Sequence, residues 1–530
     1  MKKRILCIFF MLLLCTGCGV SNEEMNTESQ KSAVVVTMPI TSEPEAGFNP
    51  IFGWGAGEHT HEPLIQSTLL TTTNDLEIGY DLATNYTVSE DGMTWSVTIR
   101  EDAFFTDGER VTAEDVAFTY NTCKENSSVN DFTMLDYAQA ENDTTVTFHM
   151  TRPFSVWPYT MALVGIVPEH AYTSAYGEMP IGSGRYMLKQ WDKGQQVILE
   201  ANPNYYGAKP KMEQVTILFM EEETSLAAAQ AEQADVSYTS ATYADVELSQ
   251  YHLLSVPSLD NRGINLPAQL PETKENSIVY GNAVTGDIAI RRAINIGIDR
   301  EAIIKNVLNG YGSPAYSICD NMPWYQNASQ VEYDLEQAKT ILEQAGWIEA
   351  EDGIRYKDGI KASFSILYPP SDTIRQGIAE AFAKEMEKLA IEAVPECVSW
   401  DIAYDMAQSQ PMLWGWGAHT PMELYNIYHS QYDTQKARYS PYYNKTVDTY
   451  MEEALKSTDI NQSYELWKKA QWDGTTGITQ QGDIPWIWIC NVDHLYFVKE
   501  GLSIPQQKIH PHGHGWSILN NVDLWEWSDT

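Results

Sequence analysis

The chain has 530 residues, and its 34 Lys and Arg against 72 Asp and Glu give a formal net charge of −38 at pH 7. Such acidity argues against nucleic acid or an anionic membrane surface as a partner, because both attract basic patches. A content of 43% hydrophobic and 11% aromatic residues excludes wholesale disorder, and the length favours two to four domain-sized units.

The start of the chain predicts a secretory signal peptide. After a basic start, the apolar run from Ile5 to Leu14 is shorter than the about 20 residues that a membrane-spanning helix needs. The small residues before Cys18 resemble a bacterial lipoprotein cleavage site, although Cys15 stands where Leu is usual. We expect lipid on Cys18, with ordinary cleavage and a free Cys18 as the alternative. The polar residues that follow predict a flexible tether, which would hold an exported protein at the outer face of the bacterial cell membrane or in the periplasm.

Strands and helices follow one another irregularly along the rest of the chain. Alternating and β-branched apolar runs predict strands, and capping residues with helical periodicity predict helices. In chain order we expect a strand at 34–38, a loop at 47–57, a strand at 94–99, a helix beginning at 112, strands at 144–150, 196–200 and 214–219, helices at 287–298, 335–345, 374–389 and 447–455, and strands at 484–489 and 494–498. This order predicts mixed α/β lobes that the chain visits more than once.

Four cysteines remain in the mature chain, at Cys123, Cys319, Cys397 and Cys490. In an exported chain such cysteines are able to form disulfides, and their spacing assigns no pair. It also matches no CxxC motif or other metal-binding pattern.

Four stretches of the chain, taken together, resemble the peptide/nickel class (family 5) of extracellular solute-binding proteins that serve ABC importers. They occur in the expected order over nearly the whole mature chain, and they contain Leu82-Ala83-Thr84-Asn85-Tyr86 through Asp115-Val116, Gly182-Ser183-Gly184-Arg185-Tyr186 through Tyr206-Gly207, Ile290-Arg291-Arg292-Ala293-Ile294-Asn295 through Gly310-Tyr311-Gly312, and Tyr333-Asp334 through Ala345-Gly346-Trp347. Arg185 departs from the family pattern, which usually has Pro at this point.

The resemblance implies an α/β, two-lobed fold of the type II periplasmic-binding-protein kind, whose hinged cleft closes on a small ligand. An extra subdomain would be inserted in lobe one. The expected divisions are a signal peptide at 1–17, the lipidated Cys and tether at 18–32, lobe one at 33–64, the inserted subdomain at 65–180, lobe one again at 181–274, lobe two at 275–480 and lobe one at 481–530.

The resemblance also implies transport and not catalysis. The chain contains no GxSxG elbow, HExxH pair or P-loop, so we expect neither enzymatic activity nor a catalytic cofactor. We expect a monomer that delivers its ligand to ABC permease subunits with their ATPases, contacts the membrane only through its lipid and binds no nucleic acid. Ligands in this family are peptides, nickel or its chelates, and some other small solutes.

Histidine positions favour a metal among these ligands. Neutral imidazole suits Ni, Cu and Zn, and residues two apart share one side of an extended chain. In the family's topology the N-terminal loop and the C-terminus lie in lobe one, while His419 would face the cleft from lobe two. The candidate metal ligands are His59, His61, His419, His510, His512 and His514. The alternative is that these are solvated loop histidines or histidines held by hydrogen bonds.

The neighbourhood of His419 supports the same ligand. Peptide-binding relatives typically carry an Asp shortly after a Trp-rich stretch, which pairs with the ligand's amino group. Here no acid follows Trp416 before Glu423, and the stretch looks more like the nickel-binding branch. We therefore expect nickel or a nickel chelate as the transported ligand. A di- or oligopeptide is the alternative, with Glu423 or Glu58 pairing with its amine.

The remaining candidates concern the walls of the cleft. Arg262 would anchor a ligand carboxylate through its planar guanidinium, or it would instead form a structural ion pair with Asp260. Trp54, Trp414 and Trp416 are candidates for cleft walls, with packing in the core as the alternative for each.

Overall fold

The computed structural model describes residues 32–56, 60–127, 129–273, 279–430, 439, 442–479 and 481–528. The predicted signal peptide, Cys18, Glu58 and His59 therefore lie outside the described residues. Within the described part, no helix is long and apolar enough to cross a membrane.

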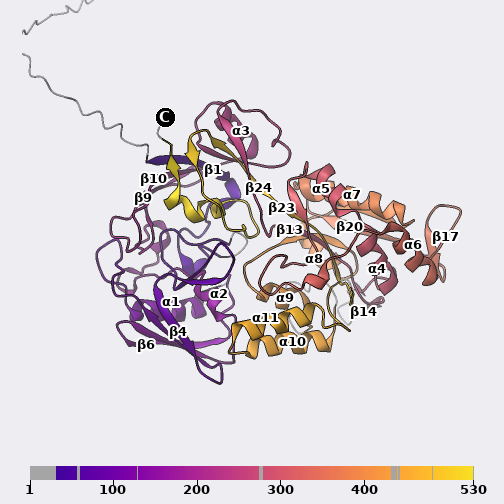
Figure 1. Cartoon of the computed structure of the whole chain (residues 1–530), viewed down its shortest axis with the longest axis horizontal. Coiled ribbons are helices and arrows are strands. Elements are labelled where there is room, and N and C mark those ends of the chain that lie inside the picture. Colours follow the sequence, from indigo (N-terminus) through magenta and orange to yellow (C-terminus); the bar gives the residue numbers. More distant parts are fainter. Residues whose placement is uncertain are drawn as a thin grey trace, which may run out of the picture.

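Lobe one is built on a seven-stranded sheet with the order β12-β24-β11-β1-β10-β9-β8 (Figure 1). Alternate side chains of β1, from Val34 to Met38, enter the same core as Trp516, so the first and last parts of the chain share this lobe. The strand β1 is parallel to β10 and β11. The elements are β1 (Ala33–Pro39), β8 (Tyr186–Asp192), β9 (Gln196–Ala201), β10 (Gln214–Met220), α3 (Glu222–Gln230), β11 (Val236–Thr239), β12 (Tyr251–Val256) and β24 (His494–Lys499).

Lobe two is built on a six-stranded sheet with the order β16-β23-β13-β22-β20-β21. Its strands are β13 (Asn261–Asn265), β16 (Gly312–Pro314), β20 (Ser363–Tyr368), β21 (Glu392–Cys397), β22 (Met412–Trp416) and β23 (Trp486–Val492). Its helices are α4 (Ile288–Gly297), α5 (Arg300–Val307), α6 (Leu335–Gln344), α7 (Thr373–Lys388), α8 (Trp400–Met406), α9 (Met422–Tyr428), α10 (Lys445–Lys456) and α11 (Ile460–Gln471). Asp287 caps α4 by accepting a hydrogen bond from the Ala289 N–H, and Ile290 and Ile294 on one face of this helix are buried.

The inserted subdomain is a four-stranded antiparallel sheet, β4-β5-β7-β6, packed against α1. Thr112 and Asp115 form a capping box that starts α1. The elements are β4 (Ala83–Val88), β5 (Thr94–Ile99), α1 (Ala113–Asn126), β6 (Leu135–Asn142), β7 (Thr145–Met150) and α2 (Trp157–Met161). The subdomain also contacts lobe two, because the Ser155 N–H donates to the Leu455 carbonyl of α10 over 2.9 Å.

Short strands complete the fold outside the three larger sheets. They are β2 (Leu70–Thr72) with β3 (Ile78–Tyr80), β14 (Glu272–Thr273) with β15 (Val279–Tyr280), β17 (Ile348–Glu349) with β18 (Arg355–Lys357) and β19 (Ile360–Lys361), and β25 (Leu502–Ser503) with β26 (Glu526–Trp527).

The two crossings between the lobes lie side by side. The Val492 N–H donates to the Asp260 carbonyl over 2.9 Å, which joins the end of β23 to the crossing between β12 and β13. The predicted boundaries at 275 and 481 placed β13 and β23 in lobe one, but both strands pair within the sheet of lobe two. Both strands are buried along their whole length. A strand of this kind has the same sequence pattern whichever sheet contains it.

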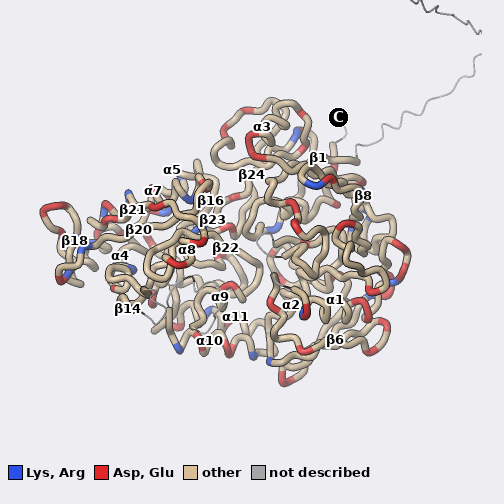
Figure 2. The backbone as a smooth tube through the Cα atoms, turned by 180° about the vertical axis from the view of Figure 1, so that it is seen from behind, with Lys and Arg blue, Asp and Glu red and all other residues tan. Residues whose placement is uncertain are grey.

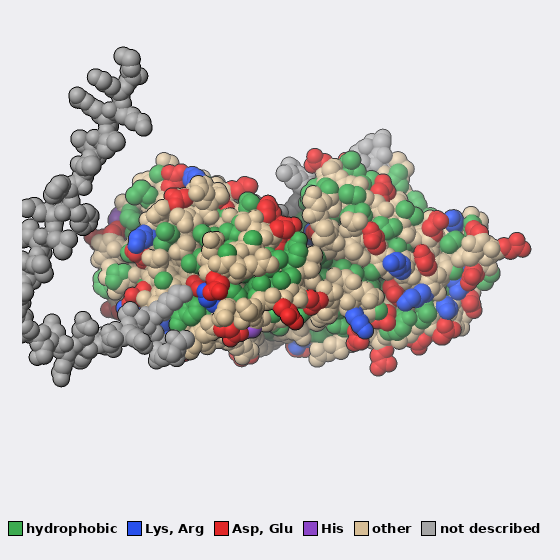
Figure 3. Space-filling model, turned by 90° about the horizontal axis from the view of Figure 1, so that it is seen from above, with side chains coloured by type: hydrophobic (Ala, Val, Ile, Leu, Met, Phe, Trp, Pro, Cys, Tyr) green, Lys and Arg blue, Asp and Glu red, His purple; other side chains and the backbone are tan. Residues whose placement is uncertain are grey.

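The surface agrees with the acidic composition. Asp and Glu are spread over both lobes, with Lys and Arg interspersed among them (Figure 2), and a furrow separates the two halves when the molecule is seen from above (Figure 3). Cys123, Cys319, Cys397 and Cys490 are free thiols, with Cys397 exposed and the others buried.

Candidate functional site

A small cavity of about 40 Å³ lies where lobe one, the subdomain and lobe two meet. This volume has room for a few water molecules at most. Its wall includes polar groups from segments more than 400 residues apart in the sequence. They are His61 and Glu62 from the N-terminal loop, Tyr159 from α2, His419 from the segment between β22 and α9, and Lys508 and Asn520 from the C-terminal segment.

A second pocket of about 200 Å³ adjoins this cavity. The two share Thr60, Tyr159 and Leu163 in their walls, so together they form one stretch of space between the lobes. The second pocket contains Asp131 of the subdomain and Glu423 of α9, and no Lys or Arg lines it among the described residues.

His419 lies in the wall of the cavity and has an unpartnered ring nitrogen. Its Nε2 is shut off from solvent and contacts no hydrogen-bonding group in the described part of the chain. Burial, together with the positive charge of Lys508, lowers the pKa of His419 to about 4, against a weaker opposing hydrogen bond to the backbone of Ile509. The ring is therefore neutral at pH 7, and its Nε2 lone pair is free to coordinate a metal ion.

His61 also lies in the wall of the cavity but is held by its surroundings. Its Nδ1 is 3.0 Å from the Glu62 carbonyl oxygen, and its ring packs against Trp54 and Trp516 with centroid distances of 4.5 and 5.8 Å. Trp54 belongs to the core of lobe one, so it supports His61 from behind.

The three C-terminal histidines point to other partners. His510 is buried beside His494, with 3.0 Å between their Nδ1 atoms, and His512 binds the Asp260 carboxylate. His514 stacks on Tyr496 and places its Nε2 3.2 Å from the Leu495 carbonyl oxygen.

Among the described residues, these three histidines therefore form no metal-binding group with His419. Burial lowers the pKa of both His510 and His514 well below the usual range. Among the described residues, no three His, Cys, Asp or Glu side chains are placed to hold a metal ion by themselves.

Arg262 forms a structural ion pair with Asp260, which is the alternative to anchoring a ligand carboxylate. Its guanidinium contacts Asp260, and both side chains are buried. Burial by itself would raise the pKa of Asp260, but Arg262 and His512 outweigh it and hold that pKa well below the usual range.

The two tryptophans of β22 differ in their degree of burial. Trp414 is 3% exposed and donates from Nε1 to the Asn265 Oδ1 over 2.9 Å, so it belongs to the core. Trp416 is half-buried, and its ring centroid is 4.6 Å from that of Tyr439. Neither tryptophan lines the cavity or the adjoining pocket.

Glu423 lines the second pocket and has an unpartnered carboxyl oxygen. Its Oε2 is shut off from solvent and contacts no hydrogen-bonding group among the described residues. Burial raises the pKa of Glu423 to about 7, against a weaker opposing hydrogen bond with the backbone of Gly417. A ligand amine entering this pocket would find an acceptor without a competing cation.

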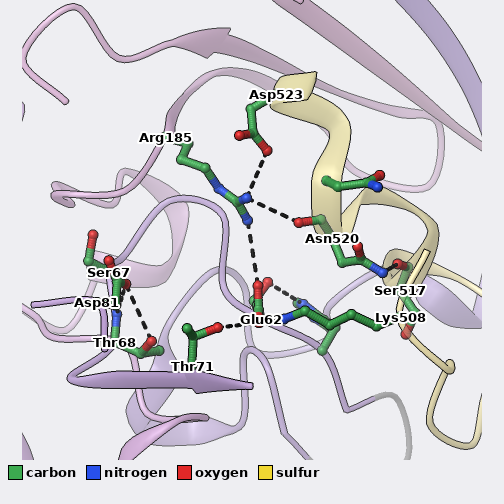
Figure 4. A network of polar contacts seen from close by, with 12 residues as sticks. Glu62, Ser67, Thr68, Thr71, Asp81, Arg185, Lys508, Ser517, Asn520 and Asp523 are labelled. Carbon is green, nitrogen blue, oxygen red and sulfur yellow. Dashed lines mark hydrogen bonds and ion pairs between the residues drawn. The ribbon is translucent and has the colours of Figure 1, made fainter. Parts of the chain in front are cut away.

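Four charged residues beside the cavity were not predicted as site residues. The Lys508 ammonium contacts Glu62, Glu62 lies 3.7 Å from Arg185, and Arg185 is 2.7 Å from Asp523 (Figure 4). We call these four residues the ionic chain. Glu62 also accepts a hydrogen bond from the Thr71 Oγ1 over 2.6 Å. The only sequence signal for this group was Arg185, which departs from the family pattern.

Known proteins resemble this chain over most of its length. Protein XP55 from Streptomyces lividans is 28% identical over 500 residues, which cover 92% of this chain and 88% of that protein. The oligopeptide-binding protein AppA from Bacillus subtilis (strain 168) is 26% identical over 563 residues, covering 98% of this chain and 96% of that protein. The solved structure of NikZ from Campylobacter jejuni in complex with Ni(L-His) has a TM-score of 0.73 at 21% identity, and it covers 94% of this chain and 99% of that one.

The structural likeness confirms the two-lobed type II fold. Residues 77–438, more than half of the chain, match the family described as "Bacterial extracellular solute-binding proteins, family 5 Middle". This family consists of binding proteins and not of enzymes. The chain belongs to the bacterial extracellular solute-binding proteins, family 5.

Proposed function

We propose that this protein captures a nickel chelate between its lobes and delivers it to the permease of an ABC importer. The observation that carries the proposal is the buried, unpartnered Nε2 of His419 in the cavity wall. A buried polar atom without a partner is costly to the folded state, and a metal ion is a partner that a neutral imidazole suits.

A chelate that extends from the cavity into the adjoining pocket suits this site better than a bare ion. The described residues place no three metal-binding side chains together, so His419 would supply one ligand and a small chelator the others. The fold neighbour NikZ was solved with Ni(L-His), which supports a chelator of amino-acid size. Nickel here is the transported ligand and not a resident cofactor.

Family 5 solute-binding proteins work with ABC permeases and their ATPases. We propose a monomer that works with ABC permease subunits and their ATPases. It would be exported and held at the outer face of the cell membrane, or in the periplasm, by lipid on Cys18.

Binding titrations with the purified, metal-free protein test the ligand. Nickel with L-histidine is expected to bind more tightly than nickel alone, zinc alone or a peptide mixture. The variant His419→Ala should weaken nickel–histidine binding at least about tenfold, because the loss of one coordinating or charge-assisted contact costs about 1.5–3 kcal/mol.

The control is His252→Ala, which removes a half-exposed histidine beside Glu500 on lobe one and should leave binding unchanged. Nickel–histidine binding that is equal in the wild type and His419→Ala would reject His419 as the metal ligand.

A di- or oligopeptide is the second candidate, and Glu423 favours it. Its Oε2 is unpartnered, and the pocket that Glu423 lines has no Lys or Arg among its described lining residues, as a ligand ammonium would require. The relative AppA, which matches 98% of this chain, is named as oligopeptide-binding. Peptide binding that is lost in Glu423→Gln and retained in His419→Ala would favour this candidate over nickel.

A further inference from the structure

We infer that Lys508 is the residue that recognises the ligand's negative charge, so that the protein selects ligands carrying a carboxylate at the C-terminal side of the cavity. The inference rests on the proposed function in one respect only, that the cavity between the lobes is where the ligand binds. It names the chemical class of the ligand group and holds for a chelator or a peptide alike.

Lys508 is the only Lys or Arg among the described residues that line the cavity. Its side chain is 14% exposed, so its charge acts in a region where water screens it weakly. An ammonium has three N–H donors, and the one acceptor that it contacts in the described part of the chain is Glu62. Donors therefore remain for a second acceptor, and a carboxylate in the cavity would supply it.

The ionic chain leaves Lys508 with a shared counterion. Glu62 also lies 3.7 Å from Arg185 and accepts from Thr71, so its negative charge is divided between two cations. Asp523 neutralises Arg185 from the other side at 2.7 Å. The ionic chain as a whole is balanced, two cations with two carboxylates, and both Lys508 at its positive end and Glu62 line the cavity. Because Glu62 is already paired with both cations, Lys508 is the group there that has donors left for a ligand.

The same arrangement holds the ammonium in place. Burial by itself would raise the pKa of Glu62, but Lys508 and Arg185 outweigh it and keep the carboxylate ionised. Arg185 is fixed in turn by donating to the Asn520 carbonyl over 3.0 Å. Lys508 is thus oriented before a ligand arrives, and less conformational entropy is lost on binding.

His419 and Lys508 would bind different parts of the ligand. The His419 ring is neutral, so it does not attract the ligand's carboxylate away from Lys508. A ligand with a soft coordinating part and a carboxylate would place the first at His419 and the second at Lys508. An amino-acid chelator and a peptide C-terminus both carry such a carboxylate.

Two matched ligand pairs test the inference by isothermal titration. The first pair is nickel with L-histidine and nickel with histamine, which lacks only the carboxylate. The second pair is trialanine and its C-terminal amide. Whichever pair binds, the wild type should prefer the carboxylate form by about 10- to 100-fold, as expected for a hydrogen bond to a charged group.

The variant Lys508→Met should bring this preference close to 1, because Met has a similar volume and no charge. Lys508→Arg should keep most of the preference. The control Lys357→Met breaks a comparable half-buried pair, with Asp287 at 2.7 Å, on the far side of lobe two, and should leave the preference unchanged. Thermal unfolding of each variant establishes that it folds.

The outcomes separate this inference from the proposed function. Binding of trialanine with a Lys508-dependent preference, without nickel binding, would reject the nickel proposal and support the role of Lys508. A preference that survives in Lys508→Met, or a wild type that binds neither pair, would overturn the inference about Lys508.

Discussion

The polar groups on the two sides of the interlobe site, in and beside the cavity and the adjoining pocket, differ in how they are paired. On the lobe-one side, Glu62, Lys508 and Arg185 are charged, and each has an ionic partner. On the lobe-two side, His419 Nε2 and Glu423 Oε2 are buried without a hydrogen-bonding partner in the described residues. Unsatisfied buried groups destabilise a fold, so the two unpartnered groups lower the stability of lobe two, and a ligand would supply their missing partners. The charged side chains of lobe one are already held in place by their ion pairs.

Breaking the ionic chain should have the largest effect on stability. Replacement of Arg185 by Met leaves Asp523 without its ion-pair partner and leaves Glu62 with Lys508 alone. Because the side chains of Arg185 and Asp523 are only 18% and 15% exposed, we expect a loss of about 3–5 kcal/mol in the free energy of unfolding. Urea denaturation monitored by tryptophan fluorescence measures this loss.

An exposed ion pair provides the control for Arg185. Lys209→Met breaks a pair with Glu213 in which both side chains are more than half exposed, and it should cost less than about 1 kcal/mol. Equal losses in the two variants would mean that burial does not increase the contribution of the ionic chain to the free energy of unfolding.

The Glu423 carboxyl should make stability fall as the pH rises. Its pKa is raised to about 7 from an ordinary value of 4.5, so the folded state holds a proton that the unfolded state has lost between these values. The wild type should therefore lose about 3 kcal/mol relative to Glu423→Gln between pH 4.5 and pH 8. Urea denaturation of both proteins at these two pH values measures the difference. Parallel pH profiles would show that Glu423 is solvated in the folded protein.

Local patterns were enough to predict some of the elements of the fold. The strands expected at 94–99 and 494–498 and the helices expected at 335–345 and 374–389 all form within one residue of the predicted bounds. The assignment of β13 and β23 to a lobe failed because both strands are buried on both faces. Nothing in such a run of residues indicates which sheet it joins.

The candidate site was harder to predict because it depends on contacts between distant segments. The spacing of His510, His512 and His514 suggested one shared side, which requires an extended backbone. Pro511 and Gly513 interrupt it, and Gly513 has a φ of +93°, so the three rings reach different partners. Glu62 and Lys508 are 446 residues apart, and no local pattern connects them.

His419 should produce a pH dependence of the opposite sign to that of Glu423. Its pKa is lowered from 6.5 to about 4, so the unfolded state takes up a proton below pH 6.5 that the folded state does not bind. The wild type should therefore lose about 2 kcal/mol relative to His419→Gln between pH 7 and pH 5. Urea denaturation of both proteins at the two pH values measures this difference. A wild type that loses no more stability than His419→Gln would show that the folded protein protonates this ring as readily as the unfolded chain does.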